Sequence, residues 1–354
     1  MIDPHVHLRD WGERHKETIR HAMQLAWRIG ISGLFEMPNT VPALTSRDTL
    51  RQRIADADRA REALGIPLFH GIYAGITADT AQLAEIVDAQ RELFPRVVGF
   101  KMFAGHSTGN MGVISRDEQW LVWHSLARND YRGVVAVHAE TEDLLRPELW
   151  DPARPISHGA ARPVEAEVHS VRQQIELALE AGFRGSLHIV HVTTPRVLDI
   201  IEHHRGSLPF ALRGGITPHH ALLDETIATH SEIPEWKVNP PLRPPDEREA
   251  LWERLRSGNA DWIESDHAPH TMDNKRDGAS GLPGIAAFRL LREELTAHLP
   301  VREVRRLSHA AVMEAFGIAP AWIPVNPNES AAWSYAQAAA EYPFDPYRHH
   351  VPSA

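Results

Sequence analysis

Histidine, lysine and acidic residues stand at the ends of several short apolar segments, and these residue types bind metal ions or transfer protons. The first such segment, 2–8, contains His5-Val6-His7. Residues two apart on a strand face the same side, so both imidazoles can reach one metal ion. With 23 histidines in 354 residues, chance alone produces one or two pairs of this spacing. The place of this pair, at the end of a predicted strand, is therefore what indicates a metal site.

A lysine, Lys101, lies inside the apolar segment 97–103. It is one of only four lysines, with Lys16, Lys237 and Lys275, among 37 basic residues. Burial disfavours the ammonium form and favours the neutral amine. A neutral amine can react with carbon dioxide to give a carbamate, an oxygen anion that can bridge two metals. The alternatives are a lysine paired with a buried carboxylate and a lysine whose amine extends to solvent.

Three further segments end in candidate ligands. His138 lies in segment 134–140, and Asp266 lies in 262–268, where it could instead cap the following helix. His188 and His191 are three apart, so on a strand they face opposite sides. We expect His191, which is nearer the segment's end, to face the site and His188 to pack outward. The combined pattern predicts one metal site built from His5, His7, Lys101, His138, His191 and Asp266.

Short apolar segments alternate along the chain with stretches of helical periodicity, which predicts strands and helices in turn. Runs such as 134–137 are apolar on both faces, as parallel strands covered by helices should be. Eight strands with intervening helices predict a (β/α)8 barrel, in which catalytic residues lie at the C-terminal ends of the strands. Segment 218–245, rich in proline and histidine, predicts a long loop with a short helix. The predicted strands are 2–8, 31–38, 67–75, 97–103, 134–140, 186–192, 209–217 and 262–268, and the predicted helices are 15–29, 46–64, 79–93, 115–129, 162–182, 195–205, 246–257, 283–297 and 301–316.

Composition excludes several classes of protein. Hydrophobic residues make up 43% and charged residues 24%, as in a globular protein, and the net charge of −10 argues against a nucleic-acid-binding surface. The absence of cysteine excludes disulfides, thiolate metal sites and thiol nucleophiles. No apolar run is long enough for a membrane span, and no signal peptide is visible, so we expect a cytoplasmic protein with a small-molecule substrate. A homodimer is a possible assembly.

Several motifs resemble the cyclic-amidohydrolase branch of the amidohydrolase superfamily, and within it the dihydroorotases. The resemblance spans about residues 2–318 in the family's order. The motifs are Asp3-Pro4-His5-Val6-His7-Leu8-Arg9-Asp10, Met37-Pro38-Asn39-Thr40, the Lys101 segment, Val137-His138-Ala139-Glu140, His191-Val192-Thr193-Thr194, Asn239-Pro240-Pro241-Leu242-Arg243 and Ser265-Asp266-His267-Ala268-Pro269-His270.

The resemblance implies a centre of two divalent metal ions, usually zinc. It places His5, His7 and Asp266 on one metal and His138 and His191 on the other. Lys101, as N6-carboxylysine formed with carbon dioxide or bicarbonate, would bridge the two metals. Many relatives also have a small β-sandwich beside the barrel; because this chain starts on the first strand, we expect the sandwich to be absent or strongly reduced. We therefore predict a barrel over 1–318 and a tail over 319–354 that is at most a vestigial sandwich segment.

The expected chemistry is hydrolysis or formation of a cyclic amide, with Asp266 as general acid and base. Arg9 lies two residues past His7 and can reach the same side, where its guanidinium suits a carboxylate, unless it pairs with Asp10 or Glu13. The family implies that Arg9, Asn39 and His270 bind a substrate carboxylate and ring, and that Asn239 binds the ring edge. This favours dihydroorotate and N-carbamoyl-L-aspartate over allantoin and hydantoins. An inactive barrel that serves as a scaffold is the remote alternative.

A glycine-rich segment, 104–112, follows the Lys101 strand. Three glycines and small polar residues are typical of a mobile loop over an active site. We expect it to close over substrate with Ser107 or Thr108 donating hydrogen bonds, and a static loop is the alternative.

Overall fold

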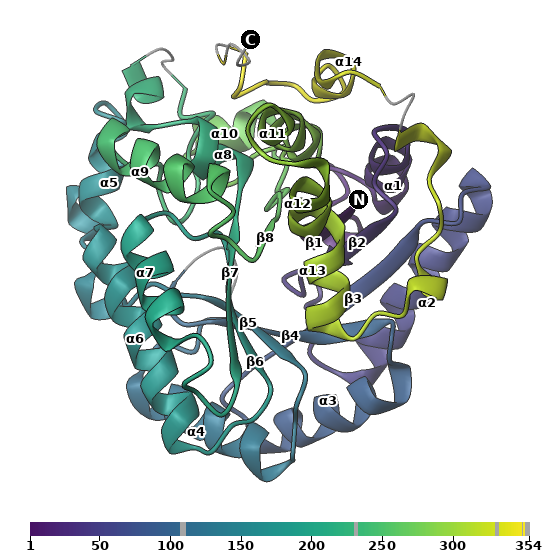
Figure 1. Ribbon diagram of the computed structural model, residues 1–354, viewed down its shortest axis with the longest axis vertical. Helices are drawn as coiled ribbons and strands as arrows, with labels where there is room; N and C mark the ends of the chain where they lie inside the picture. The colour runs from purple at the N-terminus through teal and green to yellow at the C-terminus, as the bar shows by residue number, and fades with distance from the viewer. Residues whose placement is uncertain (107–110, 230–232, 330–332, 349, 351–354) are drawn as a thin grey trace.

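Eight parallel strands form one barrel in the computed structural model, which describes residues 1–106, 111–229, 233–329, 333–348 and 350 (Figure 1). The strands follow one another around the barrel in chain order. They are β1 (Ile2–Val6), β2 (Gly33–Glu36), β3 (Phe69–Gly75), β4 (Val97–Phe103), β5 (Val134–His138), β6 (Ser186–Ile189), β7 (Ala211–Ile216) and β8 (Trp262–Ile263). The predicted (β/α)8 architecture is confirmed, although most strands are shorter than their apolar segments.

The barrel has a seam between β8 and β1. Strand β8 has only two residues, and the contact across the seam is a bridge between Val6 and His267, with the backbone N–H of His7 donating to the carbonyl of His267 at 2.7 Å. The seam therefore joins the two chain segments that carry His7 and Asp266.

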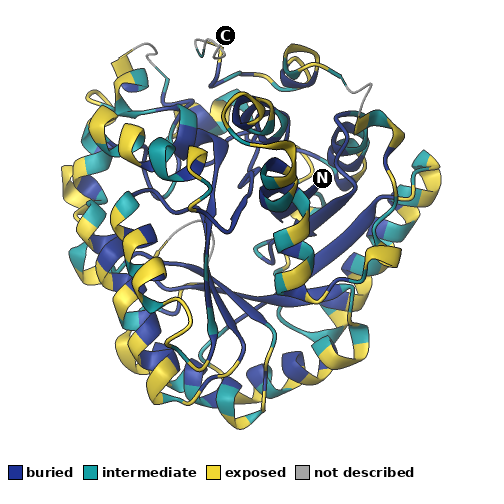
Figure 2. Ribbon diagram, viewed as in Figure 1, coloured by how far each residue is buried: buried dark blue, intermediate teal, exposed yellow. Residues whose placement is uncertain are grey.

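Helices cover the outside of the barrel, and their exposed sides face away from the strands (Figure 2). Local sequence fixes several of their ends: Ser46 and Ser115 form capping boxes at the starts of two helices, and Gly65 ends one of them with a φ of 64°. The main helices are α1 (Ile19–Arg28), α2 (Arg47–Leu64), α3 (Thr80–Leu93), α4 (Arg116–Arg128), α6 (Val164–Glu180), α7 (Pro195–His204), α9 (Pro245–Arg256), α11 (Ile285–His298), α12 (Val301–Arg305) and α13 (Ala311–Phe316).

The barrel interior is packed with side chains rather than open. Phe35, Tyr73 and Trp262 lie in one buried cluster with Phe316 of α13, whose ring lies 5.0 Å from that of Phe35. The same cluster contains Ile2 at the start of β1, so α13 closes the barrel at the N-terminal ends of the strands. The opposite end, at the strands' C-terminal ends, is left for the functional site.

Short elements fill the connections and the tail. The seventh connection contains α8 (Pro218–Leu222) and a 3-10 turn, Glu225–Thr229, as its composition predicts. Other short helices are α5 (Ser157–Ala161), α10 (Met272–Arg276) and α14 (Tyr335–Ala339). In the described part of 319–354 the chain forms helical turns and α14, and no strand. Among the described helices, none is both long and apolar enough to cross a membrane.

Candidate metal centre

The predicted ligands meet in one pocket at the C-terminal ends of the strands. His5 lies on β1, Lys101 on β4 and His138 at the end of β5, and His191 and Asp266 follow β6 and β8. All of them line a buried pocket with about 20 Å³ of free space.

Three of these residues point their ligand atoms at one another. The Nε2 atoms of His5 and His7 each lie 3.1 Å from Oδ1 of Asp266, and His5, His7 and Asp266 form a buried group that could hold a metal ion. His7 Nδ1 donates to Oδ1 of Asn39 at 2.7 Å, which leaves the lone pair of Nε2 for a metal. Although burial acts to raise the pKa of Asp266, the two histidines hold it well below its usual value, so the group is an anion.

A second pair of imidazoles meets nitrogen to nitrogen. His138 Nδ1 and His191 Nε2 lie 3.1 Å apart, and His138 Nε2 lies 2.8 Å from Oε2 of Glu140. If Nε2 of His138 carries the proton that Glu140 accepts, Nδ1 has a free lone pair directed at His191. Burial lowers the pKa of both rings, so they are neutral, as metal-binding imidazoles must be.

Lys101 supplies the most unusual group in the pocket. Its side chain is buried, and its Nζ has no hydrogen-bond partner among the described residues. Burial lowers the pKa of this amine to about 7, although the Asp266 and Glu264 carboxylates act to raise it. A substantial fraction of the amine is therefore neutral near pH 7, which is the form that reacts with carbon dioxide.

These observations test whether the residues suit a metal centre. Three neutral imidazoles, those of His7, His138 and His191, an ionised carboxylate and an unpartnered buried amine form a buried group of donor atoms that a metal cation would complete. The nitrogen and oxygen donors also match the ligands that zinc and related divalent metals take. The donor set therefore suits divalent metal ions.

Backbone strain accompanies the site. Arg9, His191 and Asp266 have positive φ angles of 54°, 42° and 45°, in the left-handed region that non-glycine residues rarely adopt. At Arg9 the strained backbone is held by Arg53, whose Nη2 donates to the Arg9 carbonyl at 3.0 Å while its guanidinium also pairs with buried Glu36.

The expected orientation of His188 is wrong. His188 does not pack outward: it lies inside the barrel, with Nε2 3.1 Å from Glu264 and its ring edge-on to Trp262. His191 faces inward as well, because it lies beyond the end of β6 with a left-handed backbone, where the alternation of strand faces no longer applies.

The predicted substrate residues are arranged around Arg9. The buried Arg9 guanidinium donates to the Pro269 carbonyl and lies 3.1 Å from Nε2 of His270 and 3.5 Å from Glu13. Burial lowers the pKa of His270 to about 2, with Arg9, Lys16 and Lys275 acting in the same direction, so its ring is neutral. Arg9 therefore pairs with Glu13, the alternative considered from sequence, and at the same time lines the pocket.

The two asparagines occupy different positions. Asn39 contacts His7 through its carbonyl oxygen, and Asn239 lines the pocket directly. Asn239 Oδ1 lies 3.1 Å from Nε2 of His158 and accepts a hydrogen bond from Ser280 at 3.2 Å, which leaves its amide N–H groups for a ligand. Ser107 and Thr108 lie outside the described residues.

Sequence reasoning gave no role to three buried residues around the centre. Glu264 contacts His5 and the His191 backbone, and Glu140 joins His138 to Arg162. His219 is buried, and neither of its ring nitrogens is hydrogen-bonded to a described residue. Burial lowers its pKa to about 4, although the charge of Asp266 acts to raise it. For both glutamates a signal was present, because each lies two residues from a predicted ligand, Asp266 or His138, on the same strand end.

Known proteins similar to this chain share both its sequence and its fold. No family model matches it. It is 32% identical to the dihydroorotase of Thermococcus kodakarensis, over 80% of this chain and 59% of that protein. It is 32% identical to the dihydroorotase of Halobacterium salinarum, over 90% of this chain and 71% of that protein, and 33% identical to that of Brevibacillus brevis, over 89% and 72%. The chain thus spans 59–72% of the length of these relatives.

Solved structures with the same fold include hydantoinases. The L-hydantoinase of Arthrobacter aurescens matches with a TM-score of 0.77 at 24% identity, over 90% of this chain and 71% of that one. A dihydroorotase from Campylobacter jejuni matches with a TM-score of 0.67 at 19% identity, over 90% and 83%. At these identities the structures show the shared barrel alone. The sequence identity to the Halobacterium and Brevibacillus proteins, over most of their lengths, shows more: this chain belongs to the dihydroorotase family.

Proposed function

We propose that the chain is an active dihydroorotase, which interconverts L-dihydroorotate and N-carbamoyl-L-aspartate. The observation that supports this most directly is the pocket itself, in which the complete set of candidate metal ligands adjoins Arg9 and His270. A guanidinium beside a neutral imidazole suits a carboxylate, and dihydroorotate is a cyclic amide that bears one.

The metals proposed are two divalent ions, and zinc fits the nitrogen and oxygen donors. His5, His7 and Asp266 would hold one, His138 and His191 the other, and Lys101 as N6-carboxylysine would lie between them. When bound, such ions polarise an amide carbonyl and lower the pKa of a water molecule. The unpartnered amine of Lys101 supports the carbamate, because carboxylation gives this buried group two oxygens that can bind cations.

The chain's own residues would position the ring and move the proton. Arg9 and His270 bind the substrate carboxylate, with Asn39 beside His7, and Asn239 donates from its free amide to the ring edge. Asp266 is ionised, so it can accept a proton from the attacking water and return it to the leaving ring nitrogen as the amide C–N bond breaks. In the reverse direction the same carboxylate accepts the proton of the attacking carbamoyl nitrogen.

An assay of four rings tests the proposal. Protein loaded with zinc in the presence of bicarbonate is expected to hydrolyse L-dihydroorotate and to form it from N-carbamoyl-L-aspartate, with about two metals per chain. Turnover of a hydantoin, allantoin or dihydrouracil in preference to dihydroorotate would identify a related cyclic amidohydrolase instead. Absence of both metal and turnover after metal-replete growth would support the scaffold alternative.

A further inference from the structure

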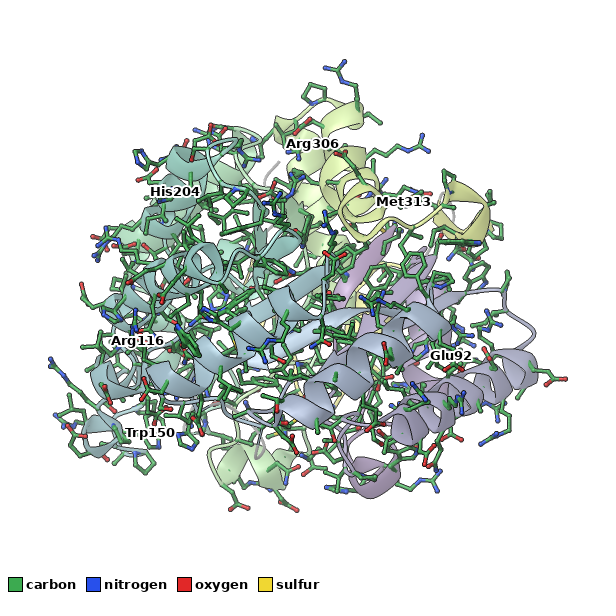
Figure 3. All side chains as sticks on the ribbon, turned by 90° about the horizontal axis from the view of Figure 1, so that it is seen from below. Glu92, Arg116, Trp150, His204, Arg306 and Met313 are labelled. Carbon is green, nitrogen blue, oxygen red and sulfur yellow. The ribbon has the colours of Figure 1, made fainter. Side chains whose placement is uncertain are left out.

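A second, larger hollow adjoins the metal pocket. It has a volume of about 210 Å³, against about 20 Å³ inside the metal pocket, and Asn239 lines both. Its walls include His106, Trp150, His158, Arg162 and Lys237. Trp150 lies at the edge of the molecule (Figure 3). Because the hollow also shares Asn239 with the metal pocket, we call it the outer chamber.

Lys237 lines the outer chamber and has unused hydrogen-bond donors. An ammonium has three N–H donors. Lys275, fully buried, directs its Nζ at three backbone carbonyls, those of Lys237, Ala279 and Gly281, and Lys16 pairs with Glu13. Lys237 donates to one carbonyl, that of Gly278 at 2.6 Å. Among the described residues it has no carboxylate partner within 4 Å, so two of its donors are available to a ligand in the chamber.

A contact with an aromatic ring fixes the position of the Lys237 ammonium. Its Nζ lies 4.7 Å from the centre of the Trp150 ring, a cation–π contact that fixes the ammonium at the chamber wall. Trp150 in turn packs edge-on against His158, which binds Asn239. A chain of contacts therefore runs from Lys237 through Trp150 and His158 to the residue that divides the chamber from the metal pocket.

The acidic groups near the chamber are already paired. Glu142, which lines the chamber, lies 2.8 Å from Nδ1 of His106 and accepts a hydrogen bond from the His106 backbone N–H at 2.7 Å, and Glu140 is bound by Arg162 and His138. Among the described residues Lys237 is thus a cation with no carboxylate within 4 Å, in a chain of net charge −10. Desolvating an uncompensated ammonium is costly unless an anion comes to it. A small carboxylate would supply that anion and has room in the chamber.

We propose that the outer chamber is a carboxylate subsite, in which Lys237 binds the substrate's carboxylate before it passes to Arg9 and holds the dianionic open-chain compound as it leaves. This rests on the proposed function in one respect, since it takes the substrate to be a carboxylate. Arg9 and Lys237 would then act in series, one in each hollow, with Asn239 between them.

Binding of a simple dicarboxylate tests the subsite without turnover. Succinate is titrated by calorimetry at low ionic strength into the metal-loaded protein, into Arg9→Met, and into Arg9→Met combined with Lys237→Met. Arg9→Met removes the inner carboxylate site, and adding Lys237→Met is expected to weaken the remaining affinity by about tenfold, as loss of a charge-assisted hydrogen bond does. A change below twofold would overturn the subsite.

The control must remove the same charge elsewhere. Arg302→Met does so on α12, next to Arg306, which lies on the opposite side of the molecule from Trp150 (Figure 3). In the Arg9→Met background it is expected to leave succinate affinity unchanged; an equal loss would mean that overall charge, rather than Lys237, governs binding, which contradicts the proposal. Lys237→Arg keeps the cation, so it distinguishes a loss of binding from a loss of folding. If Lys237→Arg, used in place of Lys237→Met in the double variant, restored the protein's stability but not its succinate affinity, the subsite would also be overturned.

Kinetics give a second, independent result. Lys237→Met is expected to lower kcat/KM for N-carbamoyl-L-aspartate about tenfold at low salt with kcat changed less than twofold, and the difference from the unmodified protein should shrink as salt rises. A fall in kcat at constant KM would indicate a purely structural role and would contradict the subsite. If the protein turns over none of the four rings, the proposed function fails and the calorimetry still decides the subsite.

Discussion

Glu264 contacts both His5 and His191, which are candidate ligands of different metal ions. Its Oε1 is 3.5 Å from Nδ1 of His5 and accepts a hydrogen bond from the backbone N–H of His191 at 2.6 Å. The His188 and Trp262 side chains contact its other oxygen. A carboxylate that orients a ligand in this way usually governs metal affinity as well as geometry.

Replacing Glu264 with glutamine is therefore expected to weaken metal binding by roughly 10- to 100-fold while the ligands stay in place. Competition with a chelator of known affinity measures this, with metal content as the readout. Glu148→Gln removes an exposed carboxylate and serves as the control. Unchanged metal affinity would show that Glu264 only fills the barrel interior.

Removal of the Lys101 amine should abolish the proposed two-metal centre. Lys101→Ala leaves the histidines and Asp266 but supplies no bridging oxygens, so we expect fewer than two metals per chain and nearly complete loss of activity. Elemental analysis and turnover should fall together. Full activity with two metals would contradict a role for carboxylated Lys101, and mass spectrometry under native conditions can detect the added carbon dioxide directly.

The carboxylate-binding role of Arg9 predicts a specific kinetic change. Arg9→Met should raise KM for dihydroorotate by roughly 10- to 100-fold, which corresponds to losing a charge-assisted hydrogen bond of about 1.5–3 kcal/mol. It should also reduce the preference for dihydroorotate over dihydrouracil, which lacks the carboxylate. A variant that keeps this preference would show that another group binds the carboxylate. Circular dichroism and metal content check that the fold is intact.

Glu17 gives the protein a defined sensitivity to acid. Its buried carboxylate lies 2.7 Å from His267 Nε2 and 2.9 Å from His21 Nδ1, and it accepts a hydrogen bond from Tyr342 at 2.8 Å. Burial acts to raise the pKa of Glu17, but His267 and His21 outweigh it and lower the pKa from 4.5 to about 2. Between these two pH values the unfolded chain binds a proton at this site that the folded protein does not.

The stability that Glu17 contributes is therefore complete above about pH 4.5 and is lost as the pH falls toward 2. The free energy of unfolding of the unmodified protein, relative to Glu17→Gln, should fall by up to about 1.4 kcal/mol for each pH unit below 4.5. Urea unfolding at pH 5, 4 and 3.5 measures the difference, and parallel stability curves for the two proteins would contradict it. Glu148→Gln is again the control.

The barrel could be predicted from sequence because its elements are encoded locally. Strands such as β5 are runs apolar on both faces, and helices such as α2 and α4 begin at serine caps that the sequence displays. The shortening of the strands was not predictable, because in segments such as 262–268 the residues beyond the last ladder hydrogen bond are polar and yet stay buried. Their final residues turn into the pocket, where burial comes from the site rather than from the sheet.

The candidate site was partly predictable for a related reason. His5 and His7, which the barrel's geometry brings together with Asp266, were identified from their places at strand ends. The orientation of His188 was not predictable. The expectation assumed that His188 and His191 alternate on one strand, but His191 lies beyond the end of β6 and has a left-handed backbone. The contacts of Asn39 with His7 and of Glu17 with Tyr342 join residues 32 and 325 positions apart, and no local pattern encodes such contacts.

The scarcity of lysine has a practical consequence for handling the protein. Lys101 lines the metal pocket and Lys237 lines the outer chamber. Lys275 donates hydrogen bonds to backbone carbonyls, including that of Lys237. The charge of Lys16 adds to burial in lowering the pKa of His270. The outer surface presents arginines, which amine-reactive reagents leave untouched. Because Lys101 and Lys275 are fully buried, attachment of dyes, tags or solid supports through lysine would fall on Lys16 and Lys237, and attachment at Lys237 would obstruct the outer chamber. The same selectivity makes a mild acylating reagent a direct probe of whether a bound ligand covers Lys237.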